Sequence, residues 1–297
     1  MSPFVLAAML YCGAAFGGSF LFMRIAAPDL PAPAVAFLRV SIAAVILLAV
    51  GGPRLIAELR RGWRGFAVLG VFMTGGPFLL FAAAEESITA GLGAIINATT
   101  PMWTVIVVAV WMRRQPTLAK IVAIVVGFAG VAVIVGVDGL RIGPEAWIGV
   151  ALATVAASSY GIGLTFVRRN MTGYDPLALA FGQLAAASVL LAPFAVLTAG
   201  QAHPTVASMA AVTGIAVLST AIAWPLLFRL NRRVGPVATS TVTFLNPIFG
   251  VLWGALFLGE IVTPTLLSGG VLVFIALGLI LEIRPLGLLR ARFAKAS

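Results

Sequence analysis

Charged residues and cysteine are both scarce in this sequence of 297 residues. Only 9% of the residues are charged and 61% are hydrophobic, whereas a soluble domain usually has about 25% charged residues. So large an apolar fraction would leave extensive hydrophobic patches on the surface of a soluble protein. The composition therefore excludes a soluble enzyme, a nucleic-acid-binding protein and a disordered chain. Cys12 is the only cysteine, which excludes an internal disulfide and a cysteine-based metal cluster.

Acidic side chains, lysine and histidine are also missing from the middle of every long apolar run. Proton-coupled antiporters commonly carry a carboxylate inside the membrane, so we expect no coupling through a buried acid. A polyanionic substrate such as a sugar phosphate would need several buried cations, and only Arg39 is available. The runs contain no Ser-His-Asp, paired-carboxylate or metal-ligand arrangement. We therefore expect neither enzymatic activity nor a cofactor or metal site.

What the sequence has instead is ten apolar runs, each about long enough to cross a bilayer as a helix of about 20 residues. Short breaks rich in Pro, Gly and polar residues separate the runs, which take up nearly the whole chain. The sequence therefore predicts an all-α integral membrane protein with ten transmembrane helices, in contact with the lipid bilayer. The predicted spans are 3–23, 33–51, 65–85, 89–112, 117–137, 144–167, 176–199, 206–229, 235–258 and 264–283.

The basic residues lie almost entirely on one side of these predicted spans. Of the 19 Lys and Arg residues, 16 lie in the loops after the even-numbered spans up to the eighth and in the C-terminal tail. Arg24 and Arg141 lie on the other side, and Arg39 lies inside the second span. We expect a multi-pass protein in the inner membrane of a bacterial cell. By the positive-inside rule, both of its termini should lie in the cytoplasm. The first span lacks a basic segment before it and is followed by Arg24, so we expect it to remain as a helix.

The two halves of the chain resemble one another. The string "SFLFMR" at 19–24 matches "GLTFVR" at 163–168, at an offset of 144 residues. We therefore predict two repeats of five helices, 1–140 and 141–297. Because five is odd, the second repeat enters the membrane from the opposite side, and such an inverted 5+5 repeat is typical of alternating-access transporters. The alternative is a duplication without transport, in a scaffold or a membrane enzyme.

Small and polar residues recur along one face of the fourth span and of the ninth. Each set follows the spacing i, i+4, i+7, i+11, which places its members on one side of a helix. Amide and hydroxyl groups in hydrocarbon need partners, so these faces should point into the protein. The sets are Gly93, Asn97, Thr100 and Thr104 and, 146 residues later, Thr239, Thr243, Asn246 and Gly250.

Four prolines form two matched pairs near the middle of the predicted spans. A proline inside a helix removes one hydrogen bond and frees a carbonyl group, which at this depth is tolerated only against protein or a water-filled cavity. We expect these prolines to kink the helices around a central cavity and to act in gating; the alternative is that they only kink packed helices. The pairs are Pro77 with Pro225 and Pro101 with Pro247.

Aromatic residues inside the spans complete the predicted site. Inward-facing rings suit a ligand with an apolar or aromatic body, although any single ring is more often in contact with lipid or core. Arg39 either binds a substrate carboxylate or, as we favour, forms an ion pair with Glu85, Glu86 or another outer acid. The predicted substrate-binding residues are Phe16, Phe78, Asn97, Thr100, Trp103, Tyr160, Trp224, Thr243 and Asn246.

Two strings in the sequence resemble those of a known family. "PAPAVAFLRVSIAA" resembles the family's proline-rich entry into its second helix, with Arg39 as its arginine, and "NPIFGVLWGALFLGEIVTP" resembles the ninth-helix signature that ends in Leu-Gly-Glu. The first half departs from this pattern, with Arg113 and Arg114 where Gly-Glu is common. Over its whole length the chain resembles the drug/metabolite transporter superfamily, EamA-type branch, and most of all the aromatic amino-acid exporters of the YddG type. The resemblance implies export of small metabolites.

Together these features predict an inner-membrane transporter that exports small metabolites, above all aromatic or bulky apolar amino acids. Transport would proceed by alternating access around a central cavity at mid-depth. The expected partners are a small-molecule substrate and the bilayer, with no nucleic acid and no obligate protein partner. The alternatives are an exporter of threonine-like amino acids, nucleosides or drugs and, from another class, a membrane enzyme or a lipid-handling scaffold.

Overall fold

The computed structural model describes residues 3–280 except 89, 114, 143 and 260–263. Every regular element in this part of the chain is a helix, and no strand occurs there. The predicted all-helical class is therefore confirmed. Its physical basis is that a helix satisfies all its backbone hydrogen bonds within one segment, as the interior of a bilayer requires.

Six helical stretches are long and apolar enough to cross a membrane. The last of them has 53 residues, more than twice the roughly 20 that one crossing needs. Gly235 divides this stretch, because its φ of 83° and ψ of 171° are not helical. The six stretches are Pro3–Ala26, Ala32–Gly51, Trp63–Ala84, Ala146–Asn170, Pro176–Leu197 and Val206–Leu258, and shorter apolar helices cover Thr100–Trp111, Leu118–Gly127 and Leu267–Ala276.

The helical elements follow the predicted spans in order but contain more interruptions than the spans did. The first half has α1 Pro3–Ala26, α2 Ala32–Gly51, α3 Arg54–Arg61, α4 Trp63–Leu69, the π-helix η1 Gly70–Gly75, α5 Gly76–Ala84, α6 Ala90–Asn97, α7 Thr100–Trp111 and α8 Leu118–Ile142. The second half has α9 Pro144–Asn170, α10 Pro176–Leu197, the 3₁₀-helix η2 Ala199–Gln201, α11 Val206–Ala216, the π-helix η3 Val217–Ile222, α12 Ala223–Ser240, the 3₁₀-helix η4 Thr241–Phe244, α13 Leu245–Leu258 and α14 Pro264–Ile280.

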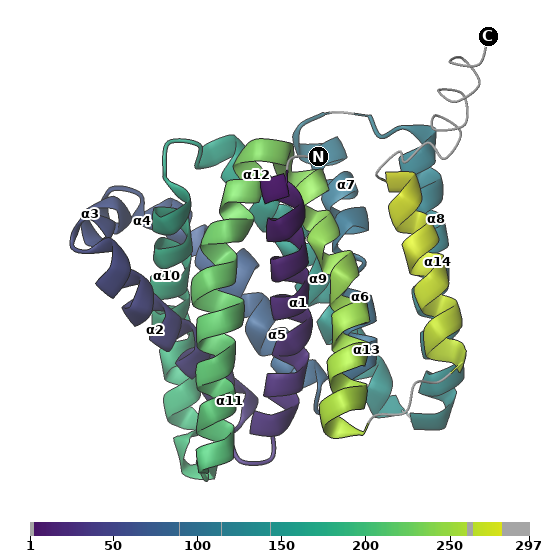
Figure 1. Ribbon diagram of the computed structural model, residues 1–297, viewed down its shortest axis with the longest axis horizontal. Coiled ribbons are helices and arrows are strands. Elements are labelled where there is room, and N and C mark those ends of the chain that lie inside the picture. The colour runs from purple at the N-terminus through teal and green to yellow at the C-terminus, as the bar shows by residue number, and fades with distance from the viewer. Residues whose placement is uncertain (1–2, 89, 114, 143, 260–263, 281–297) are drawn as a thin grey trace.

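Helices that are distant in the sequence pack in pairs. α2 packs along α10 and α8 packs along α14, and Figure 1 shows these two pairs on opposite sides of the bundle. Between them, α1 packs on α13, and α9 packs on α5 and α7. Each pair joins the first half of the chain to the second, so the two halves share one core.

Glycine allows two of these pairs to approach closely. A Cβ atom added at Gly17 of α1 would lie 2.9 Å from the carbonyl oxygen of Asn246 and 3.0 Å from the backbone nitrogen of Gly250, both on α13. A Cβ atom added at Gly161 of α9 would lie 2.9 Å from the backbone nitrogen of Thr104 on α7. Gly17 and Gly161 correspond at the offset of 144, and Thr104 and Gly250 correspond at 146. The same small-residue contact therefore occurs twice, at matched positions.

Each matched proline lies just after an interruption of α-helical geometry. The π-helix η1 ends two residues before Pro77, and the π-helix η3 ends three residues before Pro225. Pro101 is the second residue of α7 and follows the non-helical turn at 98–99. Pro247 lies in the first turn of α13, directly after η4, and its side chain lies outside the described part of the structure. π-Helical segments are rare and frequently occur at functional sites.

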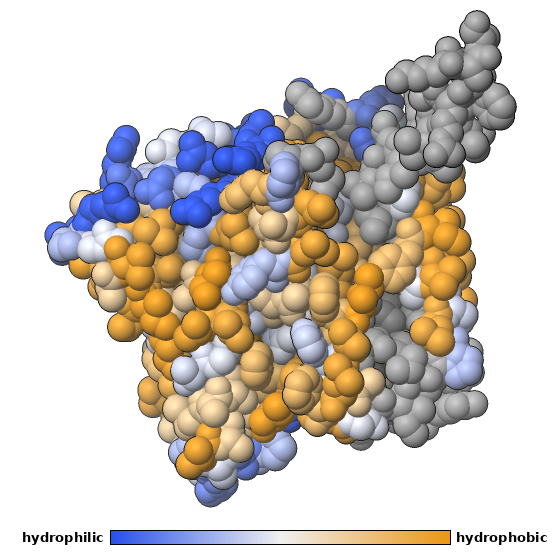
Figure 2. All heavy atoms as spheres, viewed as in Figure 1, coloured by the Kyte–Doolittle hydropathy of each residue, from blue (hydrophilic) through white to orange (hydrophobic). Residues whose placement is uncertain are grey.

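Hydrophilic side chains gather along one edge of the molecule, and most of the surface below that edge is hydrophobic (Figure 2). Within this edge, α3 exposes Arg54, Arg60 and Arg61 and buries Leu55. The sequence predicted a loop between the second and third spans at these residues, because a segment of eight residues is too short to cross the membrane. Figure 1 shows the start of α1 and the end of α14 at the same edge as α3. The basic C-terminal residues, Arg284, Arg290, Arg292 and Lys295, lie outside the described residues.

Candidate functional site

A central cavity of about 60 Å³ lies where the helices are interrupted. Seven of the ten predicted spans contribute to its wall. The second span is among them, and it contributes through Arg39, the one residue of that span that the sequence linked to the site. The lining residues are Phe16, Ser19, Phe20, Met23, Arg39, Met73, Phe78, Phe81, Asn97, Thr100, Tyr160, Leu164, Trp224, Leu227, Thr239, Ser240, Val242, Thr243 and Asn246.

The structure brings eight of the nine predicted substrate-binding residues to this one cavity. They are Phe16, Phe78, Asn97, Thr100, Tyr160, Trp224, Thr243 and Asn246. Trp103 is not among the lining residues. Its carbonyl carbon lies 3.1 Å from the position of a Cβ atom added at Gly161, so its backbone borders the contact between α7 and α9.

Three of the four outer members of the predicted polar faces have a packing role instead. Gly93 lies beside the ring of Phe20. Thr104 and Gly250 form the backbone side of the two close glycine contacts. The fourth outer member, Thr239, lines the cavity together with the two middle members of each face.

Several lining residues were not predicted, and some of them carried a signal in the sequence. Phe20 lies four residues after Phe16, and Phe81 lies three residues after Phe78, so helical spacing places each pair on one face. Met73 had no such signal, because it lies in the π-helix η1, whose irregular geometry is not visible in a uniformly apolar run.

One wall of the cavity is aromatic, with Trp224 at its centre. The Trp224 ring centroid lies 5.7 Å from that of Phe16, 6.2 Å from that of Phe78 and 6.4 Å from that of Tyr160. These separations are within the range of favourable aromatic pairs. The indole Nε1 of Trp224 is buried and has no hydrogen-bond partner among the residues that the structure describes. The wall is therefore largely apolar, and its polar groups are the unused Trp224 N–H and the Tyr160 hydroxyl.

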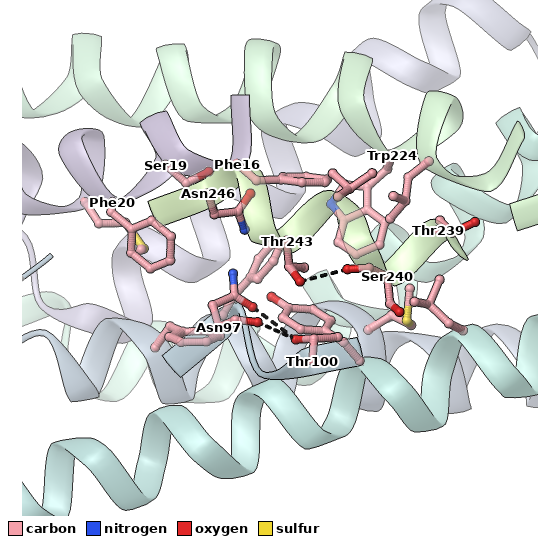
Figure 3. Close-up of a pocket in the computed structure, with 18 of the residues that line it drawn as sticks. Phe16, Ser19, Phe20, Asn97, Thr100, Trp224, Thr239, Ser240, Thr243 and Asn246 are labelled. Atoms are coloured by element: carbon pink, nitrogen blue, oxygen red, sulfur yellow. Dashed lines mark hydrogen bonds between the residues drawn. The ribbon is translucent and has the colours of Figure 1, made fainter. Parts of the chain in front are cut away.

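The facing wall is polar and comes from both halves of the chain. Thr100 Oγ1 donates to the carbonyl oxygen of Asn97 at 2.7 Å and, more weakly, to Asn97 Oδ1 at 3.4 Å. Thr243 Oγ1 donates to the carbonyl oxygen of Ser240 at 2.7 Å. Figure 3 shows the carboxamides of Asn97 and Asn246 pointing toward one another.

Asn246 is fully buried, and within the described part of the chain neither its Oδ1 nor its Nδ2 has a hydrogen-bond partner. A buried polar group left without a partner costs about 1–3 kcal/mol. Native structures keep such groups where a ligand or an ordered water can satisfy them. The cavity is therefore prepared for a molecule with polar groups at the Asn246 side.

Arg39 is 4% exposed and connects α2 to three other elements. Its Nε donates to Thr220 Oγ1 of η3 at 2.8 Å, and its Nη2 donates to Ser19 Oγ of α1 at 3.4 Å. Its guanidinium carbon lies 3.6 Å from the centroid of the Phe78 ring in α5. Glu85 is one of the acids expected to pair with Arg39, and the two charges interact electrostatically. Both hydrogen bonds from the guanidinium go to the hydroxyl groups of Thr220 and Ser19.

Glu85, expected only as an outer acid, is buried. It is 5% exposed at the end of α5, and its carbonyl oxygen accepts a hydrogen bond from Arg24 Nη1 at 3.3 Å. Close packing makes this possible, because α5 ends against the neighbouring α1 and α9 rather than in open solvent.

The chemistry of the cavity is suited to non-covalent binding of a small amphipathic molecule. It offers aromatic faces, amides, hydroxyls and one cation, and among the described residues no group of three or more His, Cys, Asp and Glu could hold a metal ion. A volume of about 60 Å³ admits water, which needs roughly 10–15 Å³ per molecule. Ligand pockets usually enclose about 300–1,000 Å³, so the walls must move apart before a substrate enters.

Among the proteins similar to this chain, one is named as an exporter and another as an inner membrane transporter. The threonine/homoserine exporter RhtA of Escherichia coli strain K12 is 26% identical over 260 residues, which cover 86% of this chain and 84% of RhtA. Protein PecM of Dickeya dadantii is 28% identical over 225 residues, 74% of each chain. The uncharacterized inner membrane transporter YedA of Escherichia coli K12 is 27% identical over 269 residues, covering 87% of this chain and 85% of YedA.

The fold and the family are shown by two further comparisons. A solved crystal structure with 16% sequence identity matches with a TM-score of 0.67 over 91% of this chain and 94% of that one, so the two share a fold. The model of the EamA-like transporter family matches residues 3–136 and 147–282, one range in each half. The resemblance to the EamA-type branch is thereby confirmed: the chain belongs to the EamA-like transporter family and is a multi-pass membrane transporter.

Proposed function

We propose that this transporter exports amino acids across the bacterial inner membrane, with a preference for aromatic or bulky apolar side chains as in exporters of the YddG type. The observation that carries the proposal is the two-sided cavity, with the Trp224 aromatic cluster on one wall and Asn97 and Asn246 on the other. An amino acid has matching parts, an apolar side chain and a polar zwitterionic end. The similarity to a protein named as a threonine/homoserine exporter supports the class of substrate.

The proposal includes ten spans in an inverted 5+5 repeat. Support comes from features that occur twice at matched positions: a π-helix before Pro77 and before Pro225, and a close glycine contact at Gly17 and at Gly161. The break at Gly235 lets the stretch 206–258 hold two spans. The helix pairs α2 with α10 and α8 with α14 also join corresponding elements of the two halves, as an inverted repeat would.

Both termini are proposed to be cytoplasmic. The start of α1, the end of α14 and the basic helix α3 lie at one edge of the bundle (Figure 1). Clustered Arg and Lys mark the cytoplasmic side of membrane proteins. A reporter test would fuse green fluorescent protein or alkaline phosphatase to the C-terminus. Fluorescence without phosphatase activity is expected, and the reverse pattern would contradict this orientation.

Transport is proposed to follow alternating access around the central cavity. Alternating access requires this cavity, which is now about 60 Å³, to widen toward one side of the membrane at a time. The interruptions at η1, η3, η4 and 98–99 surround the cavity and lack continuous α-helical hydrogen bonding. Bending at these points would open one side of the cavity at a time, as the broken helices of other transporters do.

Flux through sealed vesicles tests the proposed function. Purified protein would be reconstituted, and uptake of labelled phenylalanine, leucine and threonine would be followed against protein-free vesicles. We expect saturable uptake, with phenylalanine or leucine moved best. Transport of none of the three would overturn the proposal.

Alanine variants test the location of the site. Trp224→Ala and Asn246→Ala should each lower uptake at least tenfold at unchanged expression. The matched controls Trp63→Ala and Asn170→Ala alter exposed residues outside the cavity and should transport normally. Normal flux in both cavity variants would place the substrate elsewhere.

A threonine-like substrate is the second candidate, and the similarity to RhtA favours it. The two candidates differ in what the aromatic wall does, because threonine is too small to contact all of the rings around Trp224. Competition of labelled leucine uptake by unlabelled phenylalanine or threonine separates them. Stronger competition by threonine would select the second candidate.

A further inference from the structure

We infer that the cavity binds the carboxylate of its substrate through uncharged donors, the side-chain amides of Asn97 and Asn246 and the indole N–H of Trp224, and that Arg39 is not its ligand. This inference rests on the proposed function, since an amino acid supplies the carboxylate. It adds an orientation, with the carboxylate at the amides and the side chain against the aromatic wall.

The two halves of the chain contribute Asn and Thr in opposite order. At the offset of 146, Asn97 corresponds to Thr243 and Thr100 corresponds to Asn246. The two amides are therefore not equivalent positions of a repeat, yet they meet across one cavity. Figure 3 shows their nitrogen atoms in the space between the two side chains.

The hydroxyl groups beside the amides have already used their protons. Thr100 Oγ1 donates to the carbonyl of Asn97, and Thr243 Oγ1 donates to the carbonyl of Ser240. The contact from Thr100 to Asn97 Oδ1 engages the oxygen of that amide and leaves its NH₂ group for the cavity. A hydroxyl that has donated its single proton can only accept, so on this wall the amides of Asn97 and Asn246, rather than Thr100 and Thr243, are left to donate to a ligand.

Unpaired donors point to an acceptor-rich ligand. Asn246 is 0% exposed and Trp224 is 2% exposed, and Asn246 Nδ2 and Trp224 Nε1 have no partners in the described structure. An ionised carboxylate only accepts hydrogen bonds and has about four lone-pair sites. It can therefore satisfy Asn246 Nδ2 and Trp224 Nε1, which an ammonium or an alkyl group cannot, while Asn246 Oδ1, also without a partner in the described structure, is left as an acceptor for the ammonium.

Arg39 is occupied by other contacts. It donates to Thr220 and Ser19, its guanidinium lies over Phe78, and its charge interacts with Glu85. Moving it to a substrate would break contacts among α1, α2, α5 and η3. Arg39 is thus a positioning residue, and it adds positive charge to the cavity without binding the carboxylate.

Competition with two compounds tests the carboxylate site. In vesicles that take up labelled phenylalanine, 3-phenylpropionate keeps the carboxylate and lacks the ammonium, whereas phenylalaninamide replaces the carboxylate by an uncharged amide. We expect half-inhibition by phenylpropionate at a concentration at least tenfold lower than by phenylalaninamide. Equal competition by the two compounds, or stronger competition by phenylalaninamide, would overturn the inference. This result needs only the unaltered protein.

Two nearly isosteric variants sharpen the test. Asn246→Asp and Asn97→Asp each replace an amide donor by a negative charge beside the proposed carboxylate. Binding to the purified protein is measured as the rise in Tm that a ligand causes. In each Asp variant, the phenylpropionate concentration needed for a given rise in Tm should increase at least tenfold, whereas the phenylalaninamide concentration should not change. The control Asn170→Asp makes the same change at an exposed residue of α9 and should keep the preference of the unaltered protein.

The outcomes separate this inference from the proposed function. If the unaltered protein moves no phenylalanine, leucine or threonine, the proposed function fails and the inference fails with it. If phenylalanine moves but both Asp variants keep the normal preference, only the carboxylate site is overturned. Loss of the preference in Arg39→Gln, with both Asp variants normal, would place the carboxylate at Arg39 and would also overturn the inference.

Discussion

Gly17→Ala should weaken the protein far more than the same change at its neighbour Gly18. A Cβ atom at Gly17 would lie 2.8 Å from Phe249 Cβ and 2.9 Å from the carbonyl oxygen of Asn246, and these atoms belong to or adjoin the backbone of α13. At Gly18 the nearest atoms belong to the Trp253 side chain at 3.7 Å, an ordinary contact. Forcing a methyl group into a packed contact costs about 1–3 kcal/mol.

The expected effect is measurable by thermal unfolding in detergent. With about 2–4 °C for each kcal/mol in domains of 150–250 residues, Gly17→Ala should lower Tm by roughly 2–12 °C, and Gly18→Ala by much less. Gly161→Ala should behave like Gly17→Ala, because its Cβ would lie 2.9 Å from the backbone nitrogen of Thr104. Equal Tm values for Gly17→Ala and Gly18→Ala would refute the close contact of α1 with α13 and the packing drawn from it.

Three further predictions concern the cavity. Arg39→Lys should lower stability by about 1–3 kcal/mol, because lysine lacks the planar fork that serves two hydroxyls and a ring at once; an unchanged thermal transition would contradict this. Trp224→Phe keeps a ring but removes Nε1, so substrate Kd should rise about tenfold, and unchanged binding by calorimetry would show that the indole donor is unused. In a Cys12→Ser background, Leu164→Cys at the cavity wall should react slowly with a small thiol reagent and more slowly still with substrate present. Equal labelling rates with and without substrate would place Leu164 away from the binding site.

The sequence predicted the helical class and the identity of many cavity residues for a simple physical reason. Polar groups are rare in these apolar runs, so Asn97 and Asn246 stand out and must face protein rather than lipid. Matched prolines likewise marked where α-helical geometry breaks, at Pro77, Pro101 and Pro225. Residue chemistry alone was sufficient in these cases.

The form of the interruptions was not predictable in the same way. A π-helix, a 3₁₀-helix and a simple turn differ in which carbonyl each N–H group finds, and that choice depends on neighbouring helices. In η3 the carbonyl of Leu218 accepts a hydrogen bond from Tyr11 Oη at 3.1 Å, across 207 positions of the sequence. A contact of this kind stabilises the irregular segment but leaves no local pattern in the residues around it.

Aromatic residues were the most difficult to assign from sequence. Trp103 and Trp224 both lie within predicted spans beside a proline, yet only Trp224 reaches the cavity. Which way each ring faces depends on helix rotation, which no local pattern in the sequence fixes. At Trp103 the close contact of Gly161 with the backbone of α7 bears on that rotation.

A structure of the protein in lipid nanodiscs with bound substrate tests the central claim most directly. The account predicts an amino acid in the cavity between Asn97 and Asn246, with its carboxylate at the amides, its side chain against the Trp224 cluster and a cavity larger than the present 60 Å³ or so. Substrate bound outside this cavity, or a cavity that stays closed at saturating phenylalanine, leucine and threonine, would contradict it.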